Sequence, residues 1–274
     1  MKKIILCTVL VALGLLLTAC RRSTDENTVR IGLVGTLHYQ WYTIRDMVAE
    51  EGITLEFVFF TDFTTPNRAL HDGEIELNAF QNRIFFDTEV ATHGYEITYI
   101  AETFVAPLNI FANRARVNSL EDIQDGHTIA LPSDPTNLGR GLRLLEAAGL
   151  IVLNPVQGRL ITEMDIAEFI VDINLLPMES NMIASILPDV EAGIINNPTA
   201  FIAGLRPVTD SIFTEDVSGD IGHGLTNLIV VRTADLEAGG RLAEIFEIIA
   251  RAHNSEEVRQ VMLDAYQGAL VPVW

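Results

Sequence analysis

The chain alternates short β-branched segments with amphipathic ones, and this alternation restricts its fold more than any other feature. Residues 29–34 (VRIGLV) and 54–60 (TLEFVFF) have the pattern of β-strands. Between them, residues 38–51 place Trp41 and Ile44 at helical spacing on one face. A strand, a helix and a second strand in this order are typical of a parallel α/β sheet.

The same alternation returns further along the chain and predicts two α/β lobes, one before residue 112 and one after it. In the first lobe, we expect a turn at 61–67, helices at 68–73 and 82–93, and strands at 74–80, 95–101 and 108–112. In the second, we expect helices at 119–124, 134–148 and 182–187, and strands at 127–131, 172–176 and 191–195. A strand at 227–232 and helices at 236–252 and 255–266 end the chain. Ligands of such sheets bind beyond the carboxyl ends of the strands or between lobes.

The helix expected at residues 134–148 carries an arginine in its first turn. Asp134, Thr136 and Asn137 are short polar residues of the kind that cap helix starts. Arg140 follows them, where the positive end of the helix dipole disfavours a cation. An anion held between the free backbone N–H groups and the guanidinium would explain this placement. The alternative is an ordinary solvated arginine.

The first residues have the features of a bacterial lipoprotein signal. Two lysines precede an apolar run at residues 4–17, which is too short for a comfortable membrane span. Residues 17–20 (LTAC) look like a lipobox, in which cleavage is followed by lipidation of Cys20. Ordinary cleavage beside an incidental cysteine is the alternative. We expect a signal peptide at residues 1–19 and a lipidated tether at 20–28, which hold the remaining chain outside the plasma membrane.

Charge and cysteine content exclude several classes of partner. The formal net charge of −19 argues against binding to nucleic acid or to a membrane surface through basic side chains. Of the two cysteines, Cys7 would leave with the signal peptide, so Cys20 would have no disulfide partner. We expect neither a metal nor a cofactor, because the six histidines show no ligand spacing.

No segment carries the signature of an enzyme. The sequence lacks the G-x-S-x-G, H-E-x-x-H, phosphate-loop and G-x-G-x-x-G patterns. Adjacent carboxylates at residues 50–51 and 256–257 would point apart on a helix, and Ser180 and Ser185 have no neighbouring base in the sequence. We therefore expect no catalytic residues and no enzymatic activity.

Polar and aromatic residues gather instead in the expected loops, where binding residues are common. They are Asp62, Phe63, Pro66, Asn67, Asn78, Phe80, Gln81, Asn82, residues 134–140, Asn196, Asn197 and Asn227. Asparagine also has a structural role in turns, because it tolerates left-handed backbone and bonds its own main chain. Taken together, these residues indicate a cleft for a small polar molecule.

Several of these segments resemble the methionine-binding lipoprotein family, the substrate-binding components of methionine ABC importers. The matching segments are residues 60–70 (FTDFTTPNRAL), 78–81 (NAFQ), 107–110 (PLNI), 132–140 (PSDPTNLGR), 144–151 (LLEAAGLI), 162–166 (TEMDI), 195–196 (IN) and 227–231 (NLIVV). They follow the family's order over almost the whole chain after the tether. The resemblance implies a type II periplasmic-binding-protein fold, an α/β fold of two lobes joined by crossing strands with a ligand cleft between them.

The resemblance also implies how the lobes divide the chain. The first lobe would comprise residues 29–109 and 226–274, and the second residues 110–225. Residues 107–112 would cross outward, and the strand that begins near Asn227 would return. The protein would be a lipid-anchored monomer that delivers methionine, or a related amino acid or small peptide, to an ABC importer permease and its ATPase.

By the same resemblance, Arg140 would grip the carboxylate of an amino acid, and Asn196 and Asn227 would hold its α-amino and carboxylate groups. A planar guanidinium can donate two parallel bonds to a carboxylate, and aromatic rings contact a thioether favourably. The expected ligand-binding residues are Arg140, Asn196, Asn227, Asn137, Phe63, Phe80, Asn82 and Phe85.

The chain departs from the family pattern around the expected side-chain pocket. The family usually has Tyr where this chain has Phe63, Phe85 and Thr199, and His where it has Asn82. Residues 167–171 (AEFIV) replace the family's usual Asn-Pro-Lys stretch. Losing polar pocket groups changes discrimination strongly when the ligand group is polar. The alternatives are therefore a different amino acid or a dipeptide as ligand, an enzyme on the same fold, or a surface lipoprotein without a transport role.

Overall fold

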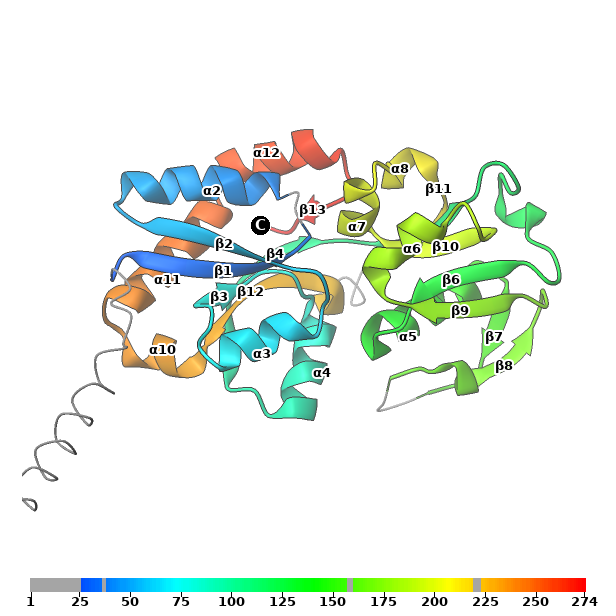
Figure 1. Ribbon diagram of the computed structural model, residues 1–274, viewed down its shortest axis with the longest axis horizontal. Coiled ribbons are helices and arrows are strands. Elements are labelled where there is room, and N and C mark those ends of the chain that lie inside the picture. Colours follow the sequence, from blue (N-terminus) through cyan, green and yellow to red (C-terminus); the bar gives the residue numbers. More distant parts are fainter. Residues whose placement is uncertain (1–25, 36–37, 157–159, 219–222) are drawn as a thin grey trace, which may run out of the picture.

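The computed structural model describes residues 26–35, 38–156, 160–218 and 223–274. The expected signal peptide and Cys20 lie outside these residues. Two lobes stand side by side, each built around its own β-sheet (Figure 1). Among the helices described, none is both long and apolar enough to cross a membrane.

The first lobe contains a six-stranded sheet in the order β13-β4-β12-β3-β1-β2. Its strands are β1 (Thr28–Val34), β2 (Thr54–Phe60), β3 (Leu77–Asn78), β4 (Ile97–Val105), β12 (Thr226–Arg232) and β13 (Val271–Pro272). β1 is parallel to β2 and β3, whereas β12 is antiparallel to β3 and β4. Parallel neighbours require a crossover connection, and α2 (Tyr39–Glu50) and α3 (Thr65–His71) supply the two that are needed.

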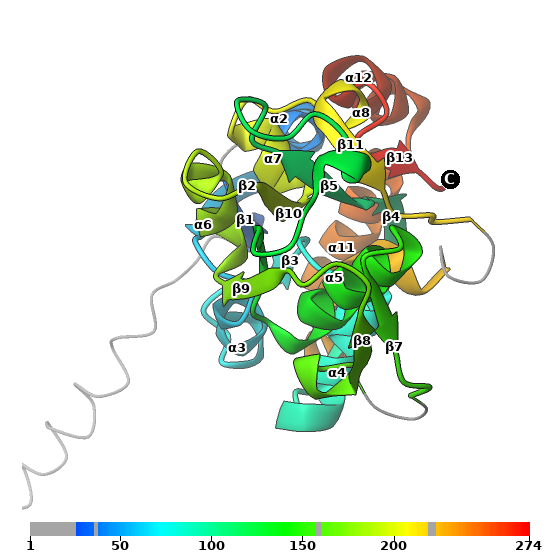
Figure 2. The same ribbon diagram turned by 90° about the vertical axis from the view of Figure 1, so that its right-hand side faces the viewer.

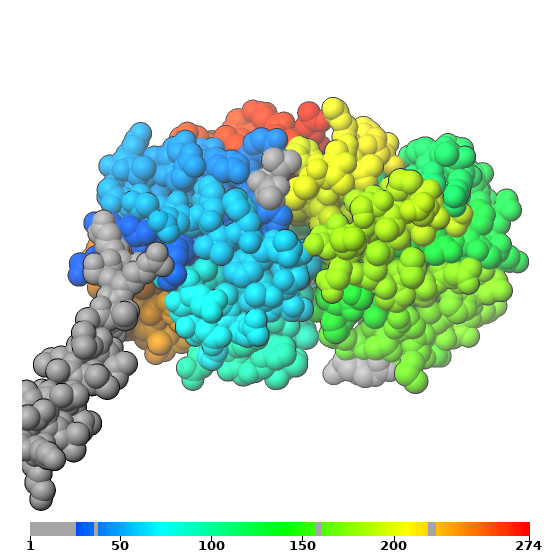
Figure 3. All heavy atoms as spheres, viewed as in Figure 1, coloured from blue at the N-terminus to red at the C-terminus, as the bar shows by residue number. Residues whose placement is uncertain are grey.

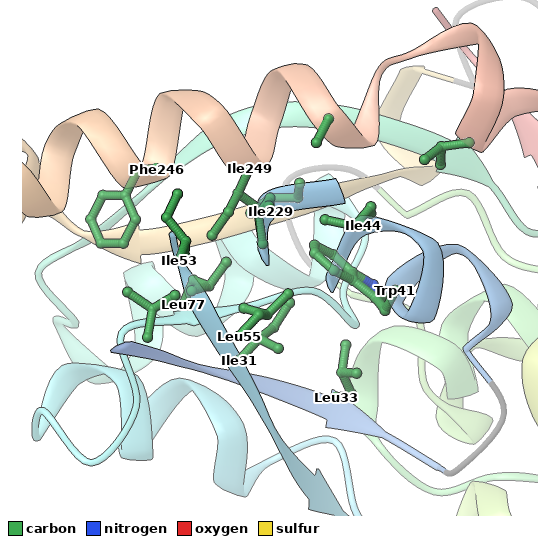
Figure 4. Packing of buried hydrophobic residues seen from close by; sticks show 14 of the residues in the cluster. Ile31, Leu33, Trp41, Ile44, Ile53, Leu55, Leu77, Ile229, Phe246 and Ile249 are labelled. Carbon is green, nitrogen blue, oxygen red and sulfur yellow. The ribbon is translucent and has the colours of Figure 1, made fainter. Parts of the chain in front are cut away.

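Helices cover both faces of this sheet, and the strand β12 divides its side chains between them. The remaining helices of the lobe are α4 (Arg83–His93), α10 (Thr233–Ala238), α11 (Gly240–His253) and α12 (Glu256–Tyr266). Ile229 and Val231 belong to the core beneath α2, α11 and α12 (Figure 4). Leu228 and Val230 point the other way, into a second cluster with residues of α3 and α4. Each such side chain contributes roughly 1.5–3 kcal/mol when buried, so the two-residue period fixes the register of this strand.

The second lobe contains a five-stranded sheet in the order β11-β5-β10-β6-β9. Its strands are β5 (Leu108–Ala112), β6 (Thr128–Pro132), β9 (Asn174–Met178), β10 (Ala192–Asn196) and β11 (Ser211–Thr214). Its helices are α5 (Pro135–Ala147), α6 (Ser180–Ile186), α7 (Asn197–Ile202) and α8 (Pro207–Asp210), with short 3-10 turns at Leu120–Asp122 and Glu163–Asp165. A separate hairpin of β7 (Ile151–Leu153) and β8 (Ile166–Phe169) lies at the end of this lobe remote from the first lobe (Figures 1 and 2).

The chain passes between the lobes twice. β4 ends at Val105 in the first sheet and β5 begins at Leu108 in the second, so residues 106–107 form the outward crossing. β11 and β12 belong to different sheets as well, and the chain returns between Thr214 and Thr226. The two crossings touch, because the backbone N–H of Glu215 donates to the Leu108 carbonyl at 2.9 Å.

Local signals in the sequence are confirmed at the ends of two helices that border the space between the lobes. The strand expected at residues 127–131 and the helix at 134–148 are present as β6 and α5. Asp134 is the N-cap residue of α5, and Gly149 takes a positive φ of 75° just beyond its end. Asn82 caps α4 in the same way, and Gly94 ends it with a φ of 69°.

Two other expectations are wrong. The helix expected at residues 236–252 is two helices, α10 and α11, because Gly239 and Gly240 take φ values of 66° and 73° between them, which a continuous helix excludes. The turn expected at 61–67 contains the start of α3, since Pro66 occupies its first turn, where the missing N–H of proline is not needed.

Candidate functional site

A cavity of about 280 Å³ lies between the two lobes. It is lined by all eight residues expected to bind a ligand, with Phe63, Phe80, Asn82, Phe85 and Asn227 from the first lobe and Asn137, Arg140 and Asn196 from the second. The lobes meet along a seam on the face shown in Figure 3. They are also joined at the cavity wall, where the Asn181 side-chain amide donates to the Thr61 carbonyl. The fold therefore gathers side chains that are far apart in the sequence.

Arg140 is buried and already has a counter-ion within the protein. Its Nη2 lies 2.6 Å from Oε2 of Glu215, and its Nε lies 3.2 Å from Oε1. Nη2 also donates to the Ala106 carbonyl at 3.2 Å, and Nη1 donates to Oδ1 of Asn137 at 3.0 Å. The solvated alternative for this arginine is therefore wrong. Glu215 could not be predicted as the partner of Arg140, because 75 positions separate the two residues and Glu215 lies in no recognisable motif.

These bonds limit what Arg140 can offer a ligand. A guanidinium has five N–H donors, and the four bonds to Glu215, Ala106 and Asn137 leave one N–H of Nη1 without an acceptor among the described residues. A ligand carboxylate can receive this N–H directly. The two parallel bonds anticipated from the sequence would require the arginine to exchange a protein partner for the ligand.

A relay of amides within the second lobe extends from the start of α5 to the end of β10. The Asp134 carboxylate accepts from the Asn137 Nδ2 at 3.1 Å, so the Asn137 oxygen must face the other way, toward Arg140 and Asn196. The Asn196 Nδ2 donates to that oxygen at 3.2 Å. The orientation of each amide is therefore set by the one before it.

The relay ends on an acceptor with no partner. Because the nitrogen of the Asn196 amide is committed to Asn137, its Oδ1 is presented on the other side, buried and without a hydrogen-bond partner among the described residues. Leaving a buried acceptor unpaired costs about 1–3 kcal/mol. A ligand with an N–H donor, such as an ammonium group, would satisfy it. The neighbouring Asn227 donates to the Phe104 carbonyl at 3.3 Å.

Two adjacent asparagines expected in this region prove to have different environments. Asn196 ends β10 and lines the cavity, whereas Asn197 is 2% exposed and lies outside it. The Asn197 oxygen accepts from Asn109, and its nitrogen donates to the Ala269 carbonyl at 2.6 Å. Asn197 therefore connects the second lobe to the end of the chain in the first lobe.

Three phenylalanines form the apolar wall of the cavity. The ring centroids of Phe63 and Phe80 are 6.1 Å apart in a stacked arrangement, and those of Phe80 and Phe85 are 5.8 Å apart and nearly perpendicular. Asn82 lies between Phe80 and Phe85 in the sequence. As the N-cap residue of α4, its side-chain oxygen accepts from the Phe85 N–H at 2.9 Å. The cap fixes the first turn of α4, and with it the position of Phe85.

A buried network of amides supports this wall from behind. Asn67 and Gln81 bond each other reciprocally, at 2.8 and 2.6 Å, and Asn78 donates to Asn67 at 3.0 Å. All three side chains are at most 2% exposed. Gln81 adjoins Phe80, and Asn67 lies in α3 behind the loop that carries Phe63, so the network joins the two segments that supply the stacked rings. Satisfied buried networks of this kind favour one arrangement of the chain.

Three further residues line another part of the cavity and were not expected from the sequence, namely His38, Gln40 and Tyr266. The Tyr266 hydroxyl donates to Oε1 of Gln40 at 2.6 Å and accepts from the Tyr39 N–H at 3.2 Å. Burial raises the pKa of Tyr266 and lowers the pKa of His38, so both favour the neutral form near neutral pH. The position of His38 and Gln40 after β1, beyond the carboxyl end of a parallel strand, is the signal that could have indicated them. Tyr266 lies at the end of α12 and has no such signal in the sequence.

The charge of the cavity wall is balanced. Among the described residues that line the cavity, Arg140 is the one with a permanent charge, and Glu215 neutralises it. No group of three or more His, Cys, Asp or Glu side chains in the described part of the chain is placed to hold a metal ion. The arrangement is that of a site for a small molecule with an apolar part and both donor and acceptor groups.

Known proteins match the chain over nearly its whole length. The family model of the NlpA lipoproteins matches residues 29–274. A protein of Vibrio cholerae serotype O1 named probable D-methionine-binding lipoprotein MetQ is 34% identical over 263 residues, which cover 95% of this chain and 94% of that protein.

Solved structures show the same two-lobed architecture. The substrate binding protein of a methionine transporter from Streptococcus pneumoniae aligns with a TM-score of 0.84 and 31% identity, over 90% of this chain and 96% of that one. A nutrient binding protein from Burkholderia cenocepacia, bound to methionine, aligns with a TM-score of 0.82 and 27% identity, over 90% and 100% of the two chains. The α/β substrate-binding fold expected from the sequence is therefore confirmed. With a family match from residue 29 to the last residue, this chain belongs to the NlpA lipoprotein family.

Proposed function

We propose that the protein is the substrate-binding component of an ABC importer and holds methionine, or a closely related amino acid, between its lobes. One observation carries this proposal. A cavity with an aromatic wall contains both an Arg140 N–H and an Asn196 oxygen that have no hydrogen-bond partner among the described residues. An α-amino acid has a carboxylate for the first and an ammonium for the second. The names of the V. cholerae and S. pneumoniae proteins support methionine as the ligand.

Each part of methionine has a complementary group in the proposed site. The carboxylate accepts from Arg140 Nη1 and from the Asn227 amide nitrogen, while the ammonium donates to Asn196 Oδ1. The thioether lies against Phe63, Phe80 and Phe85, with Asn82 at their edge, because sulfur interacts favourably with aromatic rings. Binding closes the lobes about their two crossings, one at residues 106–107 and the other between Thr214 and Thr226.

The proposal includes the place where the protein works. Cleavage of residues 1–19 and lipidation of Cys20 attach it to the outer side of the cell membrane, next to a permease and its ATPase. It acts there as a monomer and has no catalytic role. In support of the last point, the described cavity residues that could act as acid or base, His38 and Tyr266, are bonded to Val34 and Gln40 rather than to a nucleophile.

Isothermal titration calorimetry with the mature protein tests the ligand. The panel should contain L- and D-methionine, norleucine, glutamine, alanine and methionine-containing dipeptides. We expect the wild type to bind methionine. Arg140→Lys keeps the positive charge but loses the planar guanidinium with its several donors, so this variant should bind methionine at least about tenfold more weakly. If no member of the panel binds, or if Arg140→Lys binds as well as the wild type, the assignment is wrong.

One observation favours a second candidate ligand class. The four single positions that depart from the resembled family, Phe63, Asn82, Phe85 and Thr199, line the cavity, whereas the replaced stretch at residues 167–171 does not. The groups that would hold the amino acid backbone are retained, so a different amino acid or a dipeptide would enter through the same contacts. Tighter binding of norleucine or of a dipeptide than of methionine in the same titration would establish this alternative.

A further inference from the structure

A carboxylate that does not reach the cavity holds Arg140 from behind. Both oxygens of Glu215 bond the arginine, at 2.6 Å to Nη2 and 3.2 Å to Nε. Arg140 lines the cavity and Glu215 does not, and the two side chains are only 9% and 13% exposed. The guanidinium therefore separates the carboxylate from the space where a ligand would lie.

Glu215 is itself fixed by the segments that join the lobes. It follows β11 directly, at the start of the return crossing. Its Oε2 accepts from the Leu108 N–H at 2.9 Å, and its backbone N–H donates to the Leu108 carbonyl at 2.9 Å. Arg140 Nη2 donates in turn to Ala106 in the outward crossing. One ion pair thus connects α5 with both crossings.

The pair determines how Arg140 faces the cavity. Glu215 occupies Nε and one N–H of Nη2, while Ala106 and Asn137 occupy two more donors. A single N–H of Nη1 remains for a ligand carboxylate, in a direction that the other four bonds fix. The Glu215 carboxylate also neutralises the positive charge of the guanidinium, and it does so from the Nε and Nη2 edge rather than from Nη1.

We propose that Glu215 is a positioning residue of the ligand site, which orients Arg140 and cancels its charge so that the cavity selects amino acids without net charge over anionic analogues of the same shape. The inference rests on the function proposed above. The wall is already neutral with Glu215 in place, so a ligand with a net negative charge would be buried without a counter-ion. Burying an uncompensated charge is strongly unfavourable.

The test compares two ligands that differ in charge and hardly in size. They are methionine and its 2-hydroxy analogue, in which a hydroxyl replaces the ammonium and leaves one net negative charge. The wild type should prefer methionine. In Glu215→Gln, the guanidinium has lost its counter-ion and attracts the anionic ligand, so the ratio of the Kd of the analogue to that of methionine should fall by at least about tenfold.

The same lobe offers a matched control. The Glu191 carboxylate also accepts from an arginine and a backbone N–H, at 2.7 Å from Arg116 Nη1 and 2.8 Å from Thr128 N, but it does not line the cavity. Glu191→Gln should leave the ratio of the two Kd values unchanged. An unchanged ratio in Glu215→Gln, or an equal change in Glu191→Gln, would overturn the inference.

A second variant covers the case in which Glu215→Gln fails to fold. Glu215→Asp keeps the charge but is too short to bond Leu108 and Arg140 together, so both ligands should bind about tenfold more weakly while the ratio stays as in the wild type. Unaltered binding by Glu215→Asp would contradict the positioning role. If the wild type binds methionine but the variants behave otherwise than expected, only the inference about Glu215 fails. If the wild type binds no amino acid, the proposed function fails as well.

Discussion

The side-chain oxygen of Asn196 is buried without a partner, although the nitrogen of the same amide donates to Asn137 at 3.2 Å. The bond to Asn137 fixes the orientation of the amide and leaves its oxygen as an acceptor for a ligand donor. A buried acceptor without a partner gains a hydrogen bond when a ligand donor reaches it. The first prediction follows from this relationship.

Asn196→Ala should weaken methionine binding by about 10–100-fold, because a hydrogen bond to a charged group contributes about 1.5–3 kcal/mol. The unliganded protein should keep its stability within about 1 kcal/mol, since the substitution removes one bond and one unsatisfied acceptor together. Calorimetry measures the first effect and urea denaturation the second. A large loss of stability with unchanged affinity would instead assign Asn196 a structural role like that of Asn197.

Phe80→Ala should reduce the affinity for methionine and spare that for alanine. Phe80 lies between Phe63 and Phe85 in the apolar wall, and only a long side chain reaches it. Loss of its contact area should cost about 1.5–3 kcal/mol for methionine, which is about 10–100-fold in Kd. Equal losses for the two amino acids in parallel titrations would show that the ring does not contact the ligand side chain.

His253 should make the protein less stable in mild acid. It is fully buried against Trp41 and Trp274, and burial lowers its pKa from 6.5 to about 4. Between these values, the unfolded chain takes up a proton that the folded protein excludes, so stability falls as the pH decreases through this range. The loss from pH 7.5 to 4.5 should be roughly 2–3 kcal/mol.

The contribution of His253 can be separated from that of the acidic side chains by a variant. His253→Phe keeps an aromatic ring between the two tryptophans and has nothing to protonate. Urea denaturation at both pH values should show a smaller acid loss in His253→Phe than in the wild type. If both proteins lose the same stability, the buried histidine does not control this response.

The break between α10 and α11 should depend on glycine. Gly239 has φ 66° and ψ −151°, a backbone region open essentially to glycine alone, and Gly239→Ala should cost about 1–3 kcal/mol. Gly94 provides a matched control, because it also has positive φ, 69°, but with ψ 28° in the ordinary left-handed region, where alanine costs about 1 kcal/mol. Neither position has an atom within 4 Å of an added Cβ. Equal losses of stability in thermal denaturation of the two variants would refute the difference in strain.

Local features of the chain were predictable because they depend on neighbours in the sequence. The strands β1, β2 and β6 and the helices α4 and α5 follow from two-residue and helical periodicity, whereas α7, which also lines the cavity, was not predicted. The caps of α4 and α5 follow from Asn82 and Asp134. The resemblance in residues 132–140 and in the other matching segments indicated the family. The eight expected ligand-binding residues do meet in one cavity.

The interruption of the long helix near residue 240 was missed for a local reason. Its apolar positions continue at helical spacing on both sides of Gly239 and Gly240, so the periodicity alone favours one helix. The two glycines permit a positive φ but do not require it. α10 contacts β12 and β4, whereas α11 contacts α2, β4 and α12, and such contacts between distant segments are not recorded in the local pattern.

The sequence by itself determined an α/β chain of two lobes, its family, and a set of polar and aromatic residues that share a cavity. Only the tertiary structure decided that Arg140 pairs with Glu215, that Asn196 faces the cavity while Asn197 faces the protein, and that Asn137 links Arg140 to Asn196. Periodicity and capping arise from contacts between residues a few positions apart, and they leave a trace in any short stretch of sequence. The partner of a buried charge or amide depends on how distant segments pack, and no local pattern records it.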